Sequence, residues 1–286
     1  MPSADSAMMP RVVGTTNAPA IRPSPAEHHM DTRHLIDERA FTWRRFHVSL
    51  AADDHEREAV LRLRHEVFCR EWQGRSRADG IDRDRFDAHC DHLMISDRDS
   101  GLLIGTYRFN SGRNGKIFYT SDEFDLDGFT DHSDHLVEMG RACIRREWRN
   151  NMALLALGRG IAWYARTRRV DCYFGCSSVM TTEPHAVAVV ARWLERQDYV
   201  MDTHRPRPHR GNRVVGFHRA LSALGTWDAD CDRLAQDLLP PLLRFYLAAG
   251  ARVAIEPSLD RHFRCVDFFT VLDWRTANED YIRRYT

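Results

Sequence analysis

Apolar positions along the chain fall into two repeating patterns, one with helical spacing and one with strand spacing. Residues 55–72 place apolar side chains three and four positions apart, which predicts an amphipathic helix. Residues 152–169 show the same spacing and end in arginines, which the helix dipole favours there. Residues 183–199 repeat the pattern behind a proline near the start, where proline is favoured. These three segments are the expected helices of the first two thirds of the chain.

Shorter apolar runs between these helices are typical of strands. The segment 171–180, DCYFGCSSVM, is apolar enough to be a buried strand. The residues Asp99-Ser100-Gly101 are expected to turn the chain between two neighbouring strands. The expected strands are 42–51, 92–100, 102–110, 135–144 and 171–180.

The order strand, helix, hairpin, strand, helix, strand, helix predicts a mixed α/β sheet flanked by helices, with a βαβ unit in its second half. A C-terminal extension follows, with a helix at 240–250 between prolines and a glycine. Two further strands are expected at 251–257 and 265–274. The predicted domain therefore spans residues 41–286. Residues 1–40 are rich in Pro, Ala, Ser and His without periodicity, so we expect a flexible tail.

Composition narrows the function classes. Lys+Arg 41 and Asp+Glu 41 give a formal net charge of zero, so the basic excess of most nucleic-acid binders is missing, and we expect no nucleic-acid partner. No apolar run is long enough for a transmembrane helix, and the first residues lack the apolar centre of a signal peptide. Seven cysteines without a CxxC pair suit reduced thiols and a cytoplasmic location. No metal site is expected.

Charged and aromatic residues recur in four places where chemistry is plausible. Each place also has an ordinary interpretation: an exposed helix face, a solvated acidic loop, a surface arginine or a structural ion pair. Two opposite charges inside an apolar strand, at 138 and 141, are costly to bury unless they are paired or functional. The candidates in chain order are Arg64, Phe68 and Trp72; Asp82, Asp84 and Asp87; Tyr107 and Arg108; and Glu138 and Arg141.

Taken in this order, the set resembles acyl-homoserine-lactone synthases and their relatives that acylate amino acids, among them ornithine-lipid N-acyltransferases and N-acyl amino acid synthases. These are branches of the GNAT (Gcn5-related N-acyltransferase) superfamily. The C-terminal stretch LPPLLRFYLAAGARV, with the residues from Asp260 to Phe268 after it, is similar to the ornithine-acyltransferase branch. The resemblance rests on R-x-x-V-F-x-x-x-W, D-x-x-D, G-x-x-R and E-x-x-R: Arg64, Val67, Phe68, Trp72, Asp84, Asp87, Gly105, Arg108, Glu138 and Arg141.

The resemblance implies an amide-forming acyltransferase in aminolipid biosynthesis. It would move a fatty acyl group, with or without a 3-hydroxyl, from a thioester to the α-amine of an amino acid, with ornithine as the first choice. Glu138 would take the amine proton. Arg108 and Arg141 would hold a carboxylate or fix the acidic loop. Asp84 and Asp87 would hold Arg64 or face a cationic substrate side chain.

Glu138 and Arg141 share a site only if a bulge lies between them, because successive strand residues alternate between faces. Gly140 would permit that bulge. Tyr199 is a candidate proton donor to the leaving thiolate. Phe68, Trp72, Phe109 and Phe174 could line an acyl tunnel or simply form core.

The donor is expected to be acyl carrier protein rather than CoA, and no cofactor is expected to stay bound. Most CoA-using members of the superfamily carry a glycine-rich loop whose backbone N–H groups hold a pyrophosphate. The matching stretch here, RREWRNNMA, has no glycine. Arg145, Arg146 and Arg149 could instead meet the acidic carrier protein, or form an ordinary basic loop.

Three alternatives stay open. A homoserine-lactone synthase shares the front half of the motif set, an acetyl-CoA-dependent acetyltransferase has the same fold, and a non-catalytic acyl-binding protein needs only the cavity. A lipid-like product makes peripheral contact with the inner membrane plausible, and the apolar helix at 240–250 would either mediate it or belong to the core.

Overall fold

The fold is described from a computed structural model, which covers residues 39–112, 115–131, 133, 135–202, 205–278, 280 and 283. All of them belong to one compact unit that starts at Ile36. The expected tail, residues 1–40, lies outside the described residues except for its last two.

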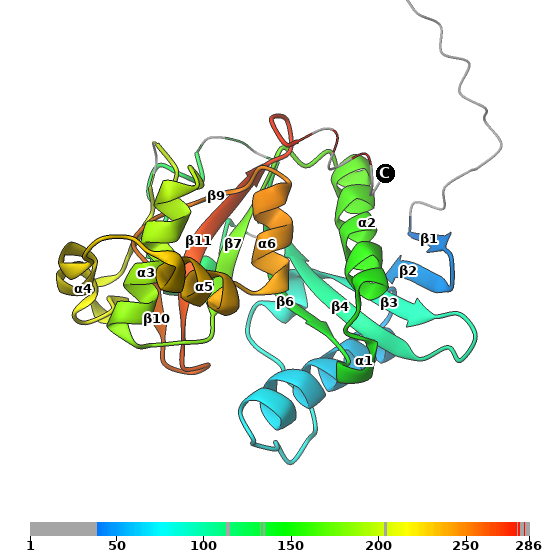
Figure 1. Cartoon of the computed structure of the whole chain (residues 1–286). Helices are drawn as coiled ribbons and strands as arrows, with labels where there is room; N and C mark the ends of the chain where they lie inside the picture. Colours follow the sequence, from blue (N-terminus) through cyan, green and yellow to red (C-terminus); the bar gives the residue numbers. More distant parts are fainter. Residues whose placement is uncertain are drawn as a thin grey trace, which may run out of the picture. The chain divides into compact units, whose positions relative to one another are not determined.

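A nine-stranded sheet forms the centre of this unit (Figure 1). Its strands follow the order β1-β2-β3-β4-β6-β7-β11-β10, and β9 pairs with β11. Among the strand pairs of the described residues, β6 and β7 are parallel and the others antiparallel. The strands are β1 (Ala40–Trp43), β2 (Phe46–Leu50), β3 (Asp91–Asp97), β4 (Leu103–Asn110), β6 (Leu136–Ile144), β7 (Cys172–Val179), β9 (Arg252–Val253), β10 (Ser258–Asp260) and β11 (Cys265–Asp273). A separate small sheet pairs β5 (Phe124–Asp125) with β8 (Arg207–Pro208).

Helices α2 (Asn151–Arg168), α6 (Pro241–Ala248) and α3 (Pro184–Arg196) cover one face of this sheet (Figure 1). α2 packs its alanine-rich side on β2, β3, β4 and β6, and α3 packs on β7 and β11. α6 joins the two, since Tyr246 belongs to the first cluster and Leu243 to the second. The β6–α2–β7 crossover is the βαβ unit predicted from the sequence.

The opposite face carries α1 (Asp54–Arg64), which continues as a π-helix, η1 (His65–Trp72). Leu63, Val67 and Phe68 pack there against Cys143 of β6. The helix predicted at 55–72 is therefore present, but its second half is wider than an α-helix. Such π-helical turns are rare and are often found at functional sites.

The mixed α/β class and the flanking helices confirm the predicted fold class, and several details differ. The first strand is a hairpin, β1–β2, which turns at Arg44 with φ 56°. Sequence reasoning missed α4 (Phe217–Ala223), α5 (Ala229–Leu238) and β10, because short elements show little periodicity. Short 3-10 turns occur at η2 (Asp87–His89), η3 (Tyr119–Asp122), η4 (Arg146–Trp148) and η5 (Arg210–Asn212).

Of the two interpretations of the helix at 240–250, the structure supports the core. The aromatic and leucine side chains of α6 at 243 and 245–247 are all buried. In the described part of the chain, no helix has the length and apolar character needed to cross a membrane.

Candidate active site

An opening between β6 and β7 organises the site. The parallel pairing of the two strands ends at Glu138–Phe174, and beyond this point they separate. At the first residues after this pair the strands still lie close, because a Cβ at Gly175 would overlap the carbonyl oxygen of Met139. Glycine is therefore required at this approach. The opening leaves β6 backbone groups without a partner strand on that side.

A bulge in β6 faces this opening. Thr106 pairs with Cys143 and Arg108 with Gly140, so two residues of β6 oppose one residue of β4. Arg141 lies in this bulge with φ 53°, a left-handed conformation that is uncommon outside glycine. The predicted bulge is thus present, although the left-handed residue is Arg141 and not Gly140. As a result, Glu138 and Arg141 point to the same face of the sheet, where both approach Tyr119.

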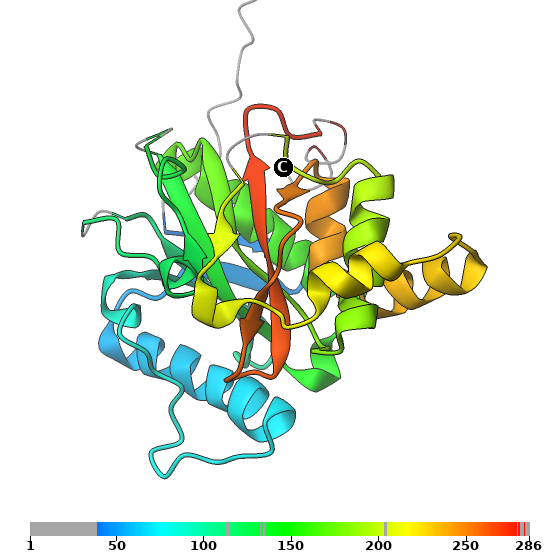
Figure 2. The ribbon, with the colours of Figure 1, turned by 90° about the vertical axis from the view of Figure 1, so that its left-hand side faces the viewer.

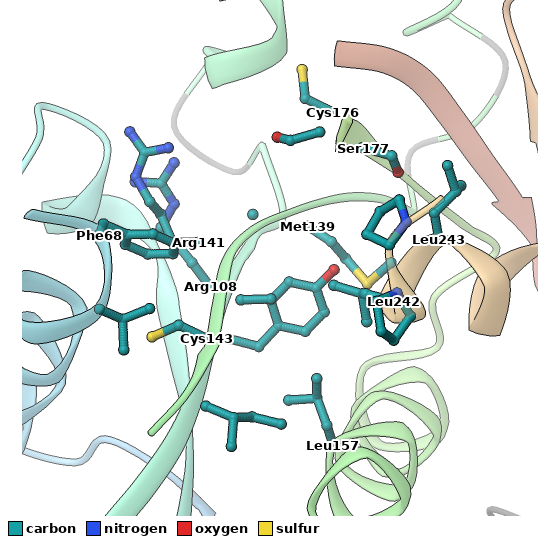
Figure 3. A pocket seen from close by; sticks show the side chains of 18 of the residues that line it. Phe68, Arg108, Met139, Arg141, Cys143, Leu157, Cys176, Ser177, Leu242 and Leu243 are labelled. Atoms are coloured by element: carbon teal, nitrogen blue, oxygen red, sulfur yellow. The ribbon is translucent and has the colours of Figure 1, made fainter. Parts of the chain in front are cut away.

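A cavity of about 470 Å³ passes through this opening (Figure 3). Its wall toward α2 and α6 is apolar, with Met139, Leu157 and Leu242 among the lining residues. Its other end is charged and lies beside Phe68, with Arg108 and Arg141 next to it (Figure 3). Glu138, Asp260 and Asp267 also line the cavity. One continuous space therefore has an apolar end and a charged end.

The charged end rests on a buried network that we call the arginine–aspartate cluster. Arg64, which is fully buried, donates from Nε to Asp82 over 2.9 Å and from Nη1 to Asp87 over 2.6 Å. Arg108 donates to both carboxylate oxygens of Asp84 over 2.7 Å and to Asp87 over 3.0 Å. The remaining member, Arg141, donates to Asp84 over 3.0 Å. Three guanidinium groups thus balance three carboxylates.

The neighbouring arginines lower the pKa of Asp84 and Asp87 in this cluster. Burial alone would raise the pKa of Asp84, but the charges of Arg108 and Arg141 outweigh it and lower that pKa. The pKa of Asp87 is lowered in the same way, chiefly by Arg64. Asp84 and Asp87 therefore stay charged, and the cluster ties the acidic loop to α1, β4 and β6. For Asp84 and Asp87 the structure shows the structural alternative, contact with Arg64 and its neighbours.

Glu138 is buried on the charged side of β6 and is held by four donors. Its Oε1 accepts from the backbone N–H and the hydroxyl of Thr120, over 2.6 and 2.7 Å. Its Oε2 accepts from the backbone N–H of Tyr119 over 3.0 Å and from Asn110 over 3.4 Å. Glu138 still contributes to the wall of the cavity. The carboxylate is therefore fixed in position at the junction of the apolar and charged ends.

The other predicted site residues divide between the cavity and the core. Phe68 and Trp72 line the cavity and pack edge to face at 5.1 Å. Phe109 and Phe174 lie instead in packed clusters on the two faces of the sheet. Tyr199 stacks on Trp193 away from the cavity, so the structure does not support it as a proton donor.

Two tyrosines to which sequence reasoning gave no role in proton transfer, Tyr107 and Tyr246, line the cavity. The hydroxyl groups of Tyr107 and Tyr246 are hydrogen-bonded to each other and line the cavity. Burial raises the pKa of both phenols, which keeps them protonated. No sequence signal could have paired them, because they lie 139 residues apart.

The three arginines predicted to meet a carrier protein differ from one another. Arg145 forms an ion pair with Glu66, and Arg149 donates to Glu71 over 2.7 Å. Both pairs fasten the loop after β6 to η1. Arg146 is exposed, and among the described residues it has no ion-pair partner.

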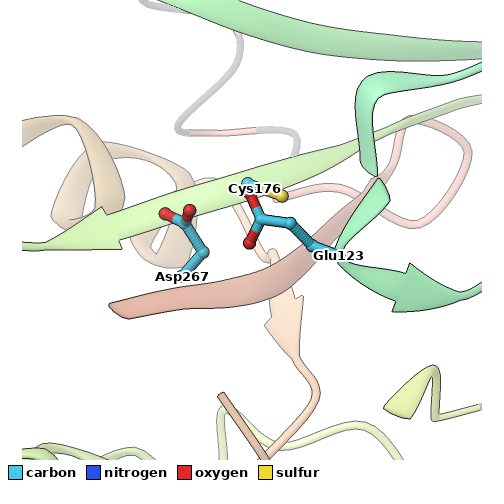
Figure 4. A group of neighbouring side chains, drawn as sticks. All are labelled: Glu123, Cys176 and Asp267. Carbon is cyan, nitrogen blue, oxygen red and sulfur yellow. The ribbon is translucent and has the colours of Figure 1, made fainter. Parts of the chain in front are cut away.

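Three buried acids lie at the cavity's charged end: Asp260 and Asp267 line it, and Glu123 lies next to Asp267. The oxygens of Glu123 and Asp267 and the sulfur of Cys176 lie within 4.8 Å of one another, close enough to hold a cation together (Figure 4). Sequence reasoning used Asp260 and Asp267 only as part of the C-terminal resemblance and did not single out Glu123.

Known proteins resemble this chain in sequence over most of its length. Residues 63–159 match the family model "Acetyltransferase (GNAT) domain". L-ornithine N(alpha)-acyltransferase of Rhodobacter capsulatus is 28% identical over 84% of this chain and 95% of its own length. The protein of the same name from Brucella abortus is 28% identical over 83% of this chain and 88% of its own.

A solved structure also matches this chain. The acyl-homoserine-lactone synthase LasI is 15% identical and covers 79% of this chain and 89% of its own, with a TM-score of 0.41. The resemblance stated from the motifs is confirmed by the sequence relatives named L-ornithine N(alpha)-acyltransferase and by the domain match.

Proposed function

We propose that this chain, which carries a GNAT acyltransferase domain, joins a fatty acyl group to the α-amine of ornithine in aminolipid biosynthesis. The acyl group is delivered as a thioester on acyl carrier protein. Two curated relatives named L-ornithine N(alpha)-acyltransferase support the acceptor. The proposal also rests on the cavity, since an acyl chain and an amino acid need opposite environments within reach of each other.

The observation that carries the proposal is the change of character along this single cavity. Its apolar end, between β6, α2 and α6, suits an acyl chain. Its charged end, beside Arg141 and Glu138, suits an amino acid. The two ends meet where β6 and β7 separate, so the thioester carbon and the amine would meet there. A protein that only bound an acyl chain would have no need of the charged end.

The geometry suggests a role for each group in the transfer. The amine nitrogen attacks the thioester carbon, the C–S bond breaks, and the amine proton passes toward Glu138. β6 backbone N–H groups beside the opening lack a partner strand and are placed to stabilise the oxyanion. The hydroxyl groups of Tyr107 and Tyr246 share one hydrogen bond, so one of the two O–H groups remains to donate to the leaving sulfur in this proposal.

Arg141 is suited to hold the carboxylate of the acceptor. Its guanidinium lies over the ring of Tyr119 at 4.6 Å, and its Nε has no hydrogen-bond partner. Arg108, in contrast, donates from Nη1 to both Asp84 and Asp87, and we assign it as a positioning residue.

The carrier-protein donor is supported by the start of α2, which borders the cavity. The side chain of Asn150 already accepts from the backbone N–H groups of Met152 and Ala153, both over 3.0 Å. Fewer N–H groups remain for a pyrophosphate, which favours the single phosphate of a carrier-bound pantetheine. Exposed Arg146 offers a cation for the acidic surface of the carrier.

The proposal is tested with purified protein, a 16-carbon acyl thioester with and without a 3-hydroxyl, and ornithine. The donors are the carrier-protein and CoA forms, and the products are identified by mass. We expect N-acylornithine, formed faster from the carrier-protein donor. Acylation of S-adenosylmethionine instead of ornithine would establish the homoserine-lactone alternative, and no product from any pair would overturn the proposal.

Glu138→Gln tests the proton acceptor. We expect kcat to fall by about 100-fold, the usual contribution of a positioned base, with a small change in the KM of ornithine. The matched control is Glu147→Gln on an exposed turn, which should keep full activity. A variant whose kcat recovers fully at high pH, where the amine is neutral, would support the assignment; equal kcat values at neutral pH would refute it.

A further inference from the structure

Three buried carboxylates lie together on the charged side of the sheet. We call them the carboxylate cluster: Glu123, Asp260 and Asp267. Asp267 of β11 lies in register between Ser258 of β10 and Ser178 of β7. Glu123 follows η3 and reaches the same place from the other side, so that its carboxylate lies near that of Asp267 (Figure 4).

This cluster has acceptors but few donors. Neither carboxylate oxygen of Glu123 has a donor in good hydrogen-bond geometry, although the side chain is 4% exposed. Its polar neighbours are Asp267, another acid, and the hydroxyl of Ser258. Oδ1 of Asp267, which is 2% exposed, and the buried hydroxyl of Ser258 likewise have no hydrogen-bond partner in good geometry. Asp260 is better satisfied, since its Oδ1 accepts from the backbone of His262 and Phe263 over 2.7 and 3.0 Å.

Positive charge is missing as well. No arginine, lysine or histidine in the described part of the chain forms an ion pair with any of the three acids. Arg141, the cation that acts on Asp267, is already engaged by Asp84 over 3.0 Å. Burying a carboxylate without a partner is costly, so a cation from outside the chain would lower the free energy of this region.

The cluster borders the reaction cavity. Asp260 and Asp267 line the cavity, together with Cys176 and Tyr119, while Glu123 lies behind Asp267. The cysteine also connects the cluster with the proposed centre, since its Sγ is 3.8 Å from the hydroxyl of Thr120, which bonds to Glu138 over 2.7 Å. A molecule bound at Glu138 thus has the cluster within reach of a short side chain.

We infer that Asp267 and Asp260, backed by Glu123, bind the side-chain ammonium of a diamino acid acceptor and so determine which amino acid is acylated. This inference rests on the proposed function. An ammonium group brings three N–H donors, which suits several carboxylate oxygens that lack donors. An acceptor with an apolar side chain would leave these carboxylates buried and unpaired, and the cavity would reject it for that reason.

The experiment compares ornithine with norvaline, which has the same carbon skeleton without the side-chain amine. The kcat/KM ratio of the two acceptors is measured for the wild type and for Asp267→Asn, which keeps the shape of the side chain. We expect the ratio to fall by about 30-fold or more in the variant, through a higher KM for ornithine, as when one partner of a buried charge pair is removed. Norvaline turnover should not fall.

Asp99→Asn is the matched control, because it makes the same chemical change on a side chain that is 81% exposed. Its acceptor ratio should equal that of the wild type. Glu123→Gln provides a second test, at the acid next to Asp267. It should also lower the ratio of kcat/KM for ornithine to that for norvaline, and its thermal unfolding curve should stay cooperative.

The outcomes separate the two proposals. If the wild type acylates ornithine and both cluster variants keep its acceptor ratio, the inference is wrong and the proposed function stands. If the wild type acylates neither acceptor, the proposed function fails. A stoichiometric divalent metal in the purified protein, whose removal by a chelator abolishes ornithine turnover, would overturn the inference in favour of a metal site.

Discussion

The arginine–aspartate cluster and the carboxylate cluster are both buried, and both bring three carboxylates together. In the first, Asp82, Asp84 and Asp87 face three arginines, and the pKa values of Asp84 and Asp87 are lowered. In the second, no cation of the described residues is paired with the acids, and burial raises the pKa of Glu123 to about 9 and that of Asp267 to about 6. The same residue type therefore has opposite protonation behaviour in two parts of one site.

We interpret the paired arginine–aspartate cluster as a structural framework and the unpaired carboxylate cluster as a binding site. Buried charges that are fully paired fix elements relative to one another, as Arg64 does for the acidic loop and α1. Buried charges that are left unpaired lower stability, and a protein keeps them where a ligand completes them. Both arrangements adjoin the same cavity, one at Arg141 and the other at Asp267.

The largest effect should follow from breaking the paired cluster. Arg64→Ala would leave Asp87 and Asp82 buried beside too few cations, and we expect the free energy of unfolding to fall by about 3–5 kcal/mol. Urea denaturation measures the change. Arg62→Ala is the control on the same helix, where the exposed pair with Glu58 should be worth less than about 1 kcal/mol. Equal losses in the two variants would contradict the structural role of the cluster.

The free energy of unfolding measured as a function of pH should contain a contribution from each of the two clusters. The lowered pKa values of Asp84 and Asp87 contribute stability above their ordinary value of 3.8, which is lost as pH falls further. Glu123 behaves in the opposite way: its pKa rises from 4.5 to about 9, so the folded state retains a proton that the unfolded chain releases. Stability should therefore also decline as pH rises from 4.5 to 9.

Glu123→Gln sharpens this test, because it removes the charge that must be buried at high pH. At pH 8 we expect a gain of the order of 2–4 kcal/mol in the free energy of unfolding, with the acid side of the curve unchanged. The neighbouring groups Asp267, Asp260, Cys176 and Arg141 remain in this variant, so a residual slope is expected. A slope identical to that of the wild type would show that Glu123 is not the titrating group.

The smallest expected effect is on the binding of acyl carrier protein when a surface arginine is exchanged for glutamate. Arg146→Glu removes an exposed arginine without an ion pair among the described residues, and we expect about threefold weaker binding of the acyl carrier protein at low salt. Arg149→Glu would also break the pair with Glu71, so its effect should include a loss of stability. Surface plasmon resonance with the carrier protein measures the first effect, and unchanged binding would argue against this docking surface.

Some features of the site could be predicted from the order of residues alone. Periodicity located the long helices and strands, because a face buried along many residues leaves a repeating signal. The spacing of Glu138 and Arg141 required a bulge for them to share a face, and the bulge is present. The motif set also identified Arg64, Asp84, Asp87 and Arg108 as a group, and the structure brings these residues into contact.

Sequence therefore determined the fold class, the family resemblance and the charged residues that form the framework, since each of these depends on local pattern or on motifs with fixed spacing. Tertiary structure alone decided which charges are paired. Glu123 and Asp267 are 144 residues apart in the chain, and their common lack of a cation follows only from the way η3, β7, β10 and β11 come together. The free energy of a buried charge depends on what surrounds it in space, and no local pattern carries that information.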